Sequence, residues 1–133
     1  MRTYFVYSNL KVSPFINGDA PIPGFDLLTW DHESCVPGTL WDLGHDAGLT
    51  KIGRGFVYGQ LWVAENTDKI KLLEEYMGVR SGLTEPNLVD VHVSTPDGEI
   101  QEIIKAVTFH LTNIKNSYKI VEDGKWQIKR TNL

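Results

Sequence analysis

The densest cluster of reactive side chains in this 133-residue chain is Asp31-His32-Glu33-Ser34-Cys35. Such a cluster suggests either a metal site or a thiol nucleophile. A zinc-type site needs about four ligands brought together at paired spacings, whereas this cluster holds one histidine and the only cysteine of the chain. We therefore interpret it as a polar loop and expect no metal site and no cofactor.

A second candidate is the stretch Tyr7-Ser8-Asn9-Leu10, which follows a run of aromatic and β-branched residues from Thr3 onward. Such a run predicts a strand that ends in a polar loop. A loop directly after a strand can direct backbone N–H groups toward a carboxylate or an oxyanion. We expect Tyr7, Ser8, Asn9 and Leu10 to take part in ligand binding.

The third candidate is the end of a helix predicted over residues 66–77. Ile70, Leu73 and Met77 fall on one stripe of this helix, and Gly78 ends it. Met77 is therefore expected to point inward where the chain leaves the helix. A carboxylate in that place would be a candidate acid or base, but a thioether cannot carry a proton.

Three carboxylates near this helix end are candidate catalytic groups. Glu74 lies about 60° around the helix and roughly one turn below position 77, so its side chain can reach the rim of a site there. Glu85 and Asp90 follow in a loop and a strand that can approach the same place. The alternative for each is an ordinary exposed charge.

Short strands separated by turns make up most of the remaining sequence. Residues 12–37 are rich in proline and glycine and predict mostly loop, with a short strand at 25–30. Further strands are predicted at 38–43, 55–63, 88–94 and 100–111, tight turns at 44–53, and a terminal hairpin of 118–121 with 126–129. This pattern predicts an α+β domain on a small closed or half-closed sheet, and the length predicts a single domain spanning 1–133.

Composition excludes several classes of partner. The net charge is −4, from 13 basic and 17 acidic residues mixed along the chain, so we expect neither nucleic acid nor an anionic membrane surface as a partner. No apolar run approaches the roughly 20 residues that span a bilayer. Because Cys35 has no second cysteine to pair with and no long apolar core follows Met1, we expect a cytoplasmic protein.

Several segments in order match the motifs of one family. Residues 5–11, Phe-Val-Tyr-Ser-Asn-Leu-Lys, look like its first strand and loop, which read Phe-Val-Tyr-Gly-Thr-Leu-Lys or, in another branch, Tyr-Gly-Ser-Asn-Leu, with one glycine lost or replaced. Residues 38–44, 47–49 and 57–63 are similar to Gly-x-Leu-x-Asp-Leu-Gly, Pro-Gly-Leu and His-Gly-Glu-Leu-Tyr-x-Val, and residues 123–126 to its closing Gly-Asp-Trp. The chain thus resembles the γ-glutamylcyclotransferase-like proteins over most of its length.

The resemblance implies a small mixed β-barrel flanked by helices, with a pocket built by the first loop and the end of the long helix. In active members the α-amine of the substrate attacks its own γ-carbonyl, which forms 5-oxoproline and expels an amine or amino acid. This is an intramolecular acyl transfer, in which one glutamate at the helix end moves the proton. Met77 takes the place of that glutamate in this chain.

These expectations leave three hypotheses open. The first is a catalytically degenerate domain, a pseudoenzyme that binds a small γ-glutamyl or amino-acid-like ligand, or a protein partner, through the 7–10 loop and Met77. The second is an active γ-glutamyl cyclotransferase in which Glu74, Glu85 or Asp90 supplies the acid and base. The third is a non-enzymatic inhibitor or adaptor that uses the proline-rich 12–37 stretch as its surface.

Overall fold

The computed structural model describes residues 2–12, 24–65, 67–94 and 99–128. The elements found there are β1 (Arg2–Val6), β2 (Phe25–Asp42), β3 (Ala47–Ala64), α1 (Thr67–Tyr76), β4 (Thr84–Ser94), β5 (Ile100–Leu111) and β6 (Lys119–Ile120). The strands of this part of the chain form one sheet in the order β1-β3-β5-β4-β2-β6. The predicted mixed α+β architecture is therefore confirmed.

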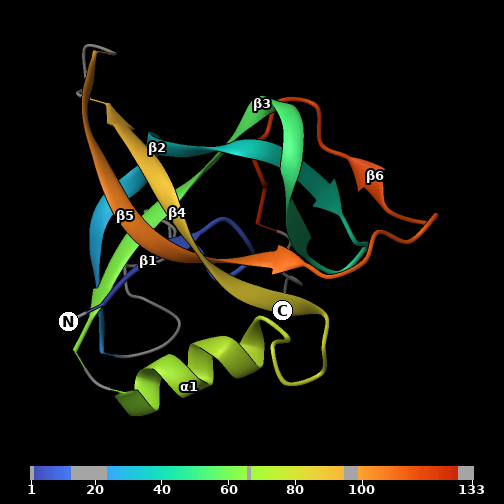
Figure 1. Ribbon diagram of the computed structural model, residues 1–133, viewed down its shortest axis with the longest axis horizontal. Helices are drawn as coiled ribbons and strands as arrows, with labels where there is room; N and C mark the ends of the chain where they lie inside the picture. The colour runs from blue at the N-terminus through green and yellow to red at the C-terminus, as the bar shows by residue number, and fades with distance from the viewer. Residues whose placement is uncertain (1, 13–23, 66, 95–98, 129–133) are drawn as a thin grey trace.

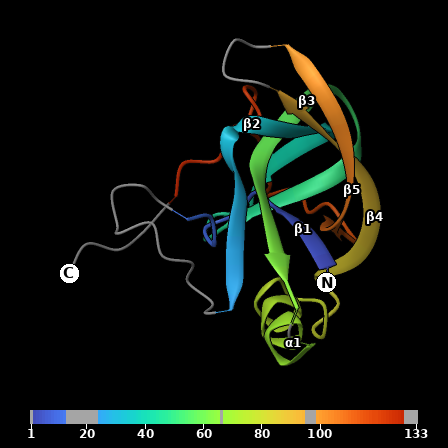
Figure 2. The ribbon, with the colours of Figure 1, turned by 90° about the vertical axis from the view of Figure 1, so that its left-hand side faces the viewer.

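The sheet curls into a ring because two further pairings join strands that are not neighbours in that order. β1 pairs with β5 in parallel at Tyr4 and Val107, and β2 pairs with β3 in antiparallel over much of its length. Figures 1 and 2 show the ring from two sides, with α1 lying beneath it in both views. Within the described residues, no helix is both long enough and apolar enough to cross a bilayer.

The core fills the ring and the space between the ring and α1. Its aromatic part includes Tyr4 and Phe109, which stack with ring centroids 6.2 Å apart, and Phe25 and Trp62, whose centroids are 5.4 Å apart. Burying such large aromatic side chains gives the largest apolar contribution per residue. The buried hydrophobic side chains include Phe5, Val6, Leu10, Leu40, Leu49, Val57, Leu61, Ile70, Leu73, Met77, Val91 and Ala106.

The prediction of mostly loop up to residue 37 is wrong for residues 31–37, which lie within β2. A bulge explains how a polar sequence remains inside a strand. Thr29 lies opposite Leu61 and Ser34 opposite Gly59, so residues 30–33 leave the ladder and the strand resumes after them. The cluster predicted as a polar loop is thus a bulge and the strand that follows it.

The prediction of several tight turns over 44–53 is also wrong beyond residue 46, because β3 starts at Ala47. β3 itself has a bulge at residues 51–54, between the pairs Thr39–Thr50 and Gly38–Gly55. Gly48 serves close packing here: a Cβ on it would lie 2.5 Å from Leu111 Cδ1. Glycine in this stretch therefore indicates tight contact between strands as well as turns.

The predicted terminal hairpin is replaced by pairing with a distant strand. β6 pairs with β2, with Ile120 opposite Trp41 and Lys119 opposite Asp42. Residues 121–128 contain no strand and fold back over the ring, where the N–H of Tyr58 donates to the carbonyl of Gly124 at 2.8 Å. Residue 129 of the predicted hairpin lies outside the described residues.

Candidate functional site

Helix α1 places Met77 as its sequence pattern predicts. Ile70, Leu73 and Met77 are all buried, with exposed fractions of 5%, 0% and 6%. The N–H of Met77 donates to the carbonyl of Leu73 at 2.9 Å, and the chain then turns at Gly78 with φ of 82°. That left-handed conformation is accessible to glycine without steric cost, so the helix ends there and Met77 faces inward.

The loop after β1 meets Met77. Ser8 is fully buried, and its hydroxyl donates to the Met77 sulfur at 3.6 Å. These two residues are 69 positions apart in the sequence. The first loop and the helix end therefore come together, which is the arrangement that the family resemblance implies for the site.

A hollow of about 200 Å³ opens beside this contact. We call it the Met77 hollow; it is lined by Asn9, Leu43, His45, Asp46, Ala47, Tyr76, Met77, Leu83 and Thr84. Of the predicted ligand-binding residues, Asn9 and Met77 line it. Tyr7, Ser8 and Leu10 do not line it and are buried, with exposed fractions of 2% or less.

Asp46 is the functional candidate that the sequence did not reveal. Its Oδ1 accepts hydrogen bonds from the backbone N–H of Asn9 at 2.9 Å and from the backbone N–H of Ala47, the next residue, at 2.7 Å. Burial raises the pKa of Asp46 above its ordinary value, although these N–H groups and the charge of His45 act in the opposite direction. An aspartate in a turn is common, so only its position before the Ala47-Gly48-Leu49 segment could have drawn attention to it.

The backbone N–H groups of the first loop are engaged within the protein. The N–H of Asn9 donates to Asp46, that of Leu10 to the Ser8 hydroxyl at 3.4 Å, and that of Lys11 to the Ser8 carbonyl at 3.1 Å. A loop that binds an anion needs such donors to point at the ligand. In this chain, acceptors within the protein receive these N–H groups where a ligand would otherwise bind.

Tyr7 has a structural role in this arrangement. Its hydroxyl donates to the carbonyl of Phe109 at 2.6 Å, in a fully buried position. Burial raises the pKa of Tyr7 strongly, and the negative charge of Asp46 raises it further. The phenol is thus held protonated and anchors the end of β1 to β5.

Lys11 anchors the other end of the loop. Its Nζ donates to Asp31 Oδ2 at 2.7 Å and to the Trp126 carbonyl at 2.8 Å, with only 4% of its side chain exposed. Burial alone raises the pKa of Asp31, but the hydrogen bond and charge of Lys11 outweigh it and hold that pKa below its ordinary value. The Trp126 indole also donates to Asn9 Oδ1 at 2.7 Å, so the bulge of β2 and the 121–128 segment both fix the loop.

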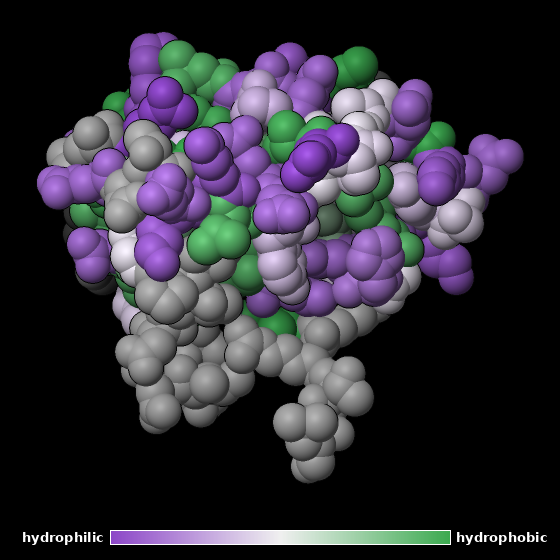
Figure 3. All heavy atoms as spheres, turned by 90° about the horizontal axis from the view of Figure 1, so that it is seen from below, coloured by the Kyte–Doolittle hydropathy of each residue, from purple (hydrophilic) through white to green (hydrophobic). Residues whose placement is uncertain are grey.

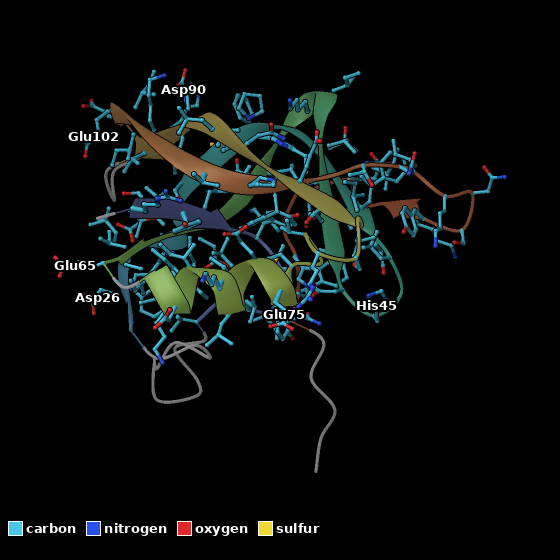
Figure 4. All side chains as sticks on the ribbon, turned by 60° about the horizontal axis from the view of Figure 1, so that its bottom comes forward. Asp26, His45, Glu65, Glu75, Asp90 and Glu102 are labelled. Carbon is cyan, nitrogen blue, oxygen red and sulfur yellow. The ribbon has the colours of Figure 1, made fainter. Side chains whose placement is uncertain are left out.

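The three predicted acids do not line the Met77 hollow. Glu74 lines a separate hollow of about 190 Å³ with Arg2 and Tyr4, and Glu85 lines another of about 580 Å³ beside His110. Asp90 is paired with Lys105 at 3.0 Å on the surface. Figure 4 shows Asp90 at the upper side of the molecule, whereas His45, a lining residue, lies near the C-terminal end of α1. A catalytic role for any of the three stays a prediction.

The residues of the first cluster are separated by the bulge. Asp31 pairs with Lys11, Glu33 accepts the N–H of Trp30 at 2.8 Å, and Ser34 donates to the carbonyl of Gly59. Burial raises the pKa of the Cys35 thiol, which disfavours the reactive thiolate. Within the described ranges, no three His, Cys, Asp or Glu side chains are grouped to hold a metal ion.

Several solved structures share the fold of this chain, and three of them are compared with it below. YkqA from Bacillus subtilis has a TM-score of 0.65 and 16% identity, covering 94% of this chain and 39% of its own. A γ-glutamyl cyclotransferase has a TM-score of 0.60 and 19% identity, covering 90% of this chain and 69% of its own. An AIG2-like protein from Mus musculus has a TM-score of 0.65 and 15% identity, covering 87% of this chain and 80% of its own.

These similarities define the fold. No protein-family model matches the sequence, and a comparison with curated proteins gives no significant match. The chain spans little more than a third of the length of YkqA. It has the mixed α+β fold of the γ-glutamyl cyclotransferase-like proteins, as the sequence motifs predicted.

Proposed function

We propose that this protein is a catalytically degenerate γ-glutamylcyclotransferase-like domain that binds a small amino-acid-like ligand in the Met77 hollow. The observation that carries the proposal is the contact of Ser8 Oγ with Met77 Sδ at 3.6 Å. It places a thioether beside the first loop, where the family resemblance expects the catalytic glutamate. A thioether cannot take the proton from the attacking amine or return it to the leaving nitrogen.

The state of the first loop supports the same proposal. Cyclisation develops negative charge on the carbonyl oxygen, and backbone N–H groups can stabilise that charge only if they point at it. The N–H groups of Asn9, Leu10 and Lys11 already donate to Asp46 and Ser8. Proton transfer and oxyanion stabilisation are therefore both weakened in one site.

The size and character of this surface fit a small ligand better than a protein partner. The Met77 hollow holds about 200 Å³. Figure 3 views the molecule from the α1 side, and the described residues there show hydrophobic groups only in small patches between hydrophilic ones. Protein-binding sites more often present a larger continuous apolar patch. We expect the ligand to be met in the cytoplasm, given the single cysteine.

One observation favours an active enzyme as the second candidate function. Asp46 is a carboxylate on the wall of the Met77 hollow, and a pKa raised by burial suits a group that must both accept and donate a proton. In this alternative Asp46, rather than Glu74, Glu85 or Asp90, performs the proton transfers of an intramolecular acyl transfer.

An assay for 5-oxoproline separates the two. The purified chain is incubated with γ-glutamyl dipeptides and γ-glutamylamines, and the products are followed by mass spectrometry. We expect no 5-oxoproline above the spontaneous rate. Release by the wild-type chain that is lost in Asp46→Asn would support the second candidate, and loss in Glu74→Gln, Glu85→Gln or Asp90→Asn would identify one of those acids instead.

A further inference from the structure

The side chains that line the Met77 hollow favour a cationic ligand over an anionic one. Among the described residues that line it, Asp46 is the only carboxylate and none is a lysine or an arginine. The one basic residue on the wall is His45, which is exposed. A ligand in this hollow therefore meets a fixed negative charge without a fixed positive one.

Asp46 also removes the donor that an anionic ligand would need. The N–H of Asn9 donates to Asp46 Oδ1, and the N–H of Ala47 donates to the same oxygen. A carboxylate ligand would have to displace Asp46 from these groups and lie beside its charge. In a partly buried site such a like-charge contact costs more than it does in water.

The acceptors that remain suit a cation. The N–H groups of Asn9 and Ala47 both donate to Oδ1 of Asp46, so Oδ2 can accept from a ligand. Thr84 adds a second acceptor, because its hydroxyl donates its own proton to the Met77 carbonyl at 2.8 Å and keeps lone pairs on Oγ1. A primary ammonium group has three N–H donors and the opposite charge.

The rest of the wall suits a short apolar chain. Leu43, Ala47, Met77 and Leu83 contribute aliphatic or thioether surface. A hollow of about 200 Å³ has room for roughly seven heavy atoms, at about 30 Å³ for each water-sized atom. This matches an alkyl chain of about four to six carbons with one polar end.

We propose that the Met77 hollow binds short primary alkylamines, with the ammonium group held by Asp46 and Thr84, and that it discriminates against the corresponding carboxylates. The inference rests on the proposed function, in which the hollow is a binding site. It names the ligand class: the ammonium end of an amino-acid-like compound is the end that is recognised.

The test is a titration of the full chain followed by two-dimensional NMR of the backbone amides. The probes are n-butylammonium chloride, sodium butyrate and n-butanol, which share a four-carbon chain and differ in charge. We expect n-butylammonium to shift the amide signals of Asn9, Asp46, Ala47 and Thr84 in a saturable way. Its affinity should exceed that of butyrate and butanol by about ten-fold or more, since a charge-assisted hydrogen bond is roughly twice as strong as a neutral one.

A matched pair of variants locates the effect. Asp46→Asn keeps an acceptor oxygen for the amides of Asn9 and Ala47 but removes the charge, and it should weaken n-butylammonium binding by about ten-fold or more. Glu102→Gln removes an exposed charge on β5, away from the hollow, and should leave the affinity unchanged. Far-UV circular dichroism checks that both variants fold.

Equal or tighter binding of butyrate by the wild-type chain would overturn the inference without any variant, as would the absence of binding by all three probes. Wild-type affinity in folded Asp46→Asn would overturn it as well. Tighter binding of butyrate, or wild-type affinity in Asp46→Asn, leaves the hollow as a binding site and so overturns the inference alone, whereas release of 5-oxoproline refutes catalytic degeneracy whichever probe binds. Conversely, the chain can lack cyclotransferase activity even if the hollow does not prefer amines.

Discussion

At the scale of residues, Met77 and Asp46 together change what the site can do. Met77 occupies the inward position at the end of α1 and contacts Ser8, and in the proposed function it stands where the family resemblance expects the proton carrier. Asp46 occupies the Asn9 amide, so a donor for developing negative charge is engaged. In the proposed function each of these two features weakens cyclotransferase catalysis, and they act on different parts of the reaction.

The first prediction concerns the stability of Asp46→Asn. Because burial raises the pKa of Asp46 in the folded chain, ionising it costs stability, and this cost appears as the pH rises through the raised pKa. Asp46→Asn should therefore melt at a higher temperature than the wild-type chain at pH 7. At about pH 3, where Asp46 is largely protonated in both states, the difference should disappear.

Thermal unfolding by circular dichroism at the two pH values measures this difference, with Glu102→Gln as the control for a lost surface charge. A variant that is less stable than the wild-type chain at pH 7 would show that the charge of Asp46 contributes more through its N–H partners than burial costs.

At the scale of elements, the bulge of β2 and the 121–128 segment hold the first loop through Lys11. Its Nζ joins Asp31 of the bulge to the Trp126 carbonyl, and it is almost fully buried. The loop is therefore fixed from two sides by segments that are distant in the sequence. We infer that the shape of the Met77 hollow depends on this buried ion pair.

The second prediction compares two ion pairs of the same type. Lys11→Met should lower the free energy of unfolding by about 2–3 kcal/mol, less than the roughly 3–5 kcal/mol of a fully buried pair, because Asp31 is 39% exposed and can rehydrate. Lys105→Met breaks the pair with Asp90, whose side chains are 70% and 54% exposed, and should cost about 1 kcal/mol or less. Urea unfolding of both variants tests the contrast, and equal losses would refute it.

The sequence predicted elements where local pattern decides the structure and failed where distant partners decide it. The stripe of Ile70, Leu73 and Met77 set the helix and its inward face correctly. The bulge at residues 30–33 depends on how β2 aligns with β3, and β6 finds its partner in β2 instead of a nearby hairpin strand. Neither alignment is visible in local composition.

The candidate site was likewise predicted in part from the sequence. The contact between the first loop and Met77 was expected from the motifs of the family, whereas the role of Asp46 arises from a turn that reaches across to Asn9. An aspartate in a glycine-rich turn has many ordinary explanations. Its place on the wall of the hollow appears only when β2, β3 and α1 are assembled.

At the scale of the whole molecule, closure of the sheet keeps the first loop and α1 in fixed relation. β1 lies between β3 and β5 at the place where the ring closes (Figure 1). Gly59 of β3 lies against β1, and a Cβ there would be 2.6 Å from Phe5 Cζ and 2.6 Å from the Val6 carbonyl oxygen. Only a residue without a side chain fits between these strands.

The third prediction follows from this contact. Gly59→Ala should destabilise the chain by about 1–3 kcal/mol, because the backbone oxygen cannot move aside as a flexible side chain can. Gly55→Ala is the matched control on the same strand, since a Cβ there meets nothing within 4 Å. Urea unfolding should separate the two, and a Gly59→Ala chain as stable as Gly55→Ala would show that the ring adjusts freely at its closure.

The central claim is that Met77 and the contact of Asp46 with the Asn9 amide together prevent cyclotransferase catalysis, and changing both residues is its most direct test. We predict that the wild-type chain and Met77→Glu release no 5-oxoproline from γ-glutamylamines, because Asp46 still occupies the Asn9 amide and repels both the new carboxylate and the substrate. Met77→Glu combined with Asp46→Ala frees that amide and supplies a proton carrier.

The measurement is the rate of 5-oxoproline release by each of the three chains, with folding checked by circular dichroism. The account predicts that only the double variant exceeds the spontaneous rate, with a gain of about 10²–10⁴-fold from acid–base catalysis. Release by the wild-type chain, or release by Met77→Glu alone at the rate of the double variant, would contradict it.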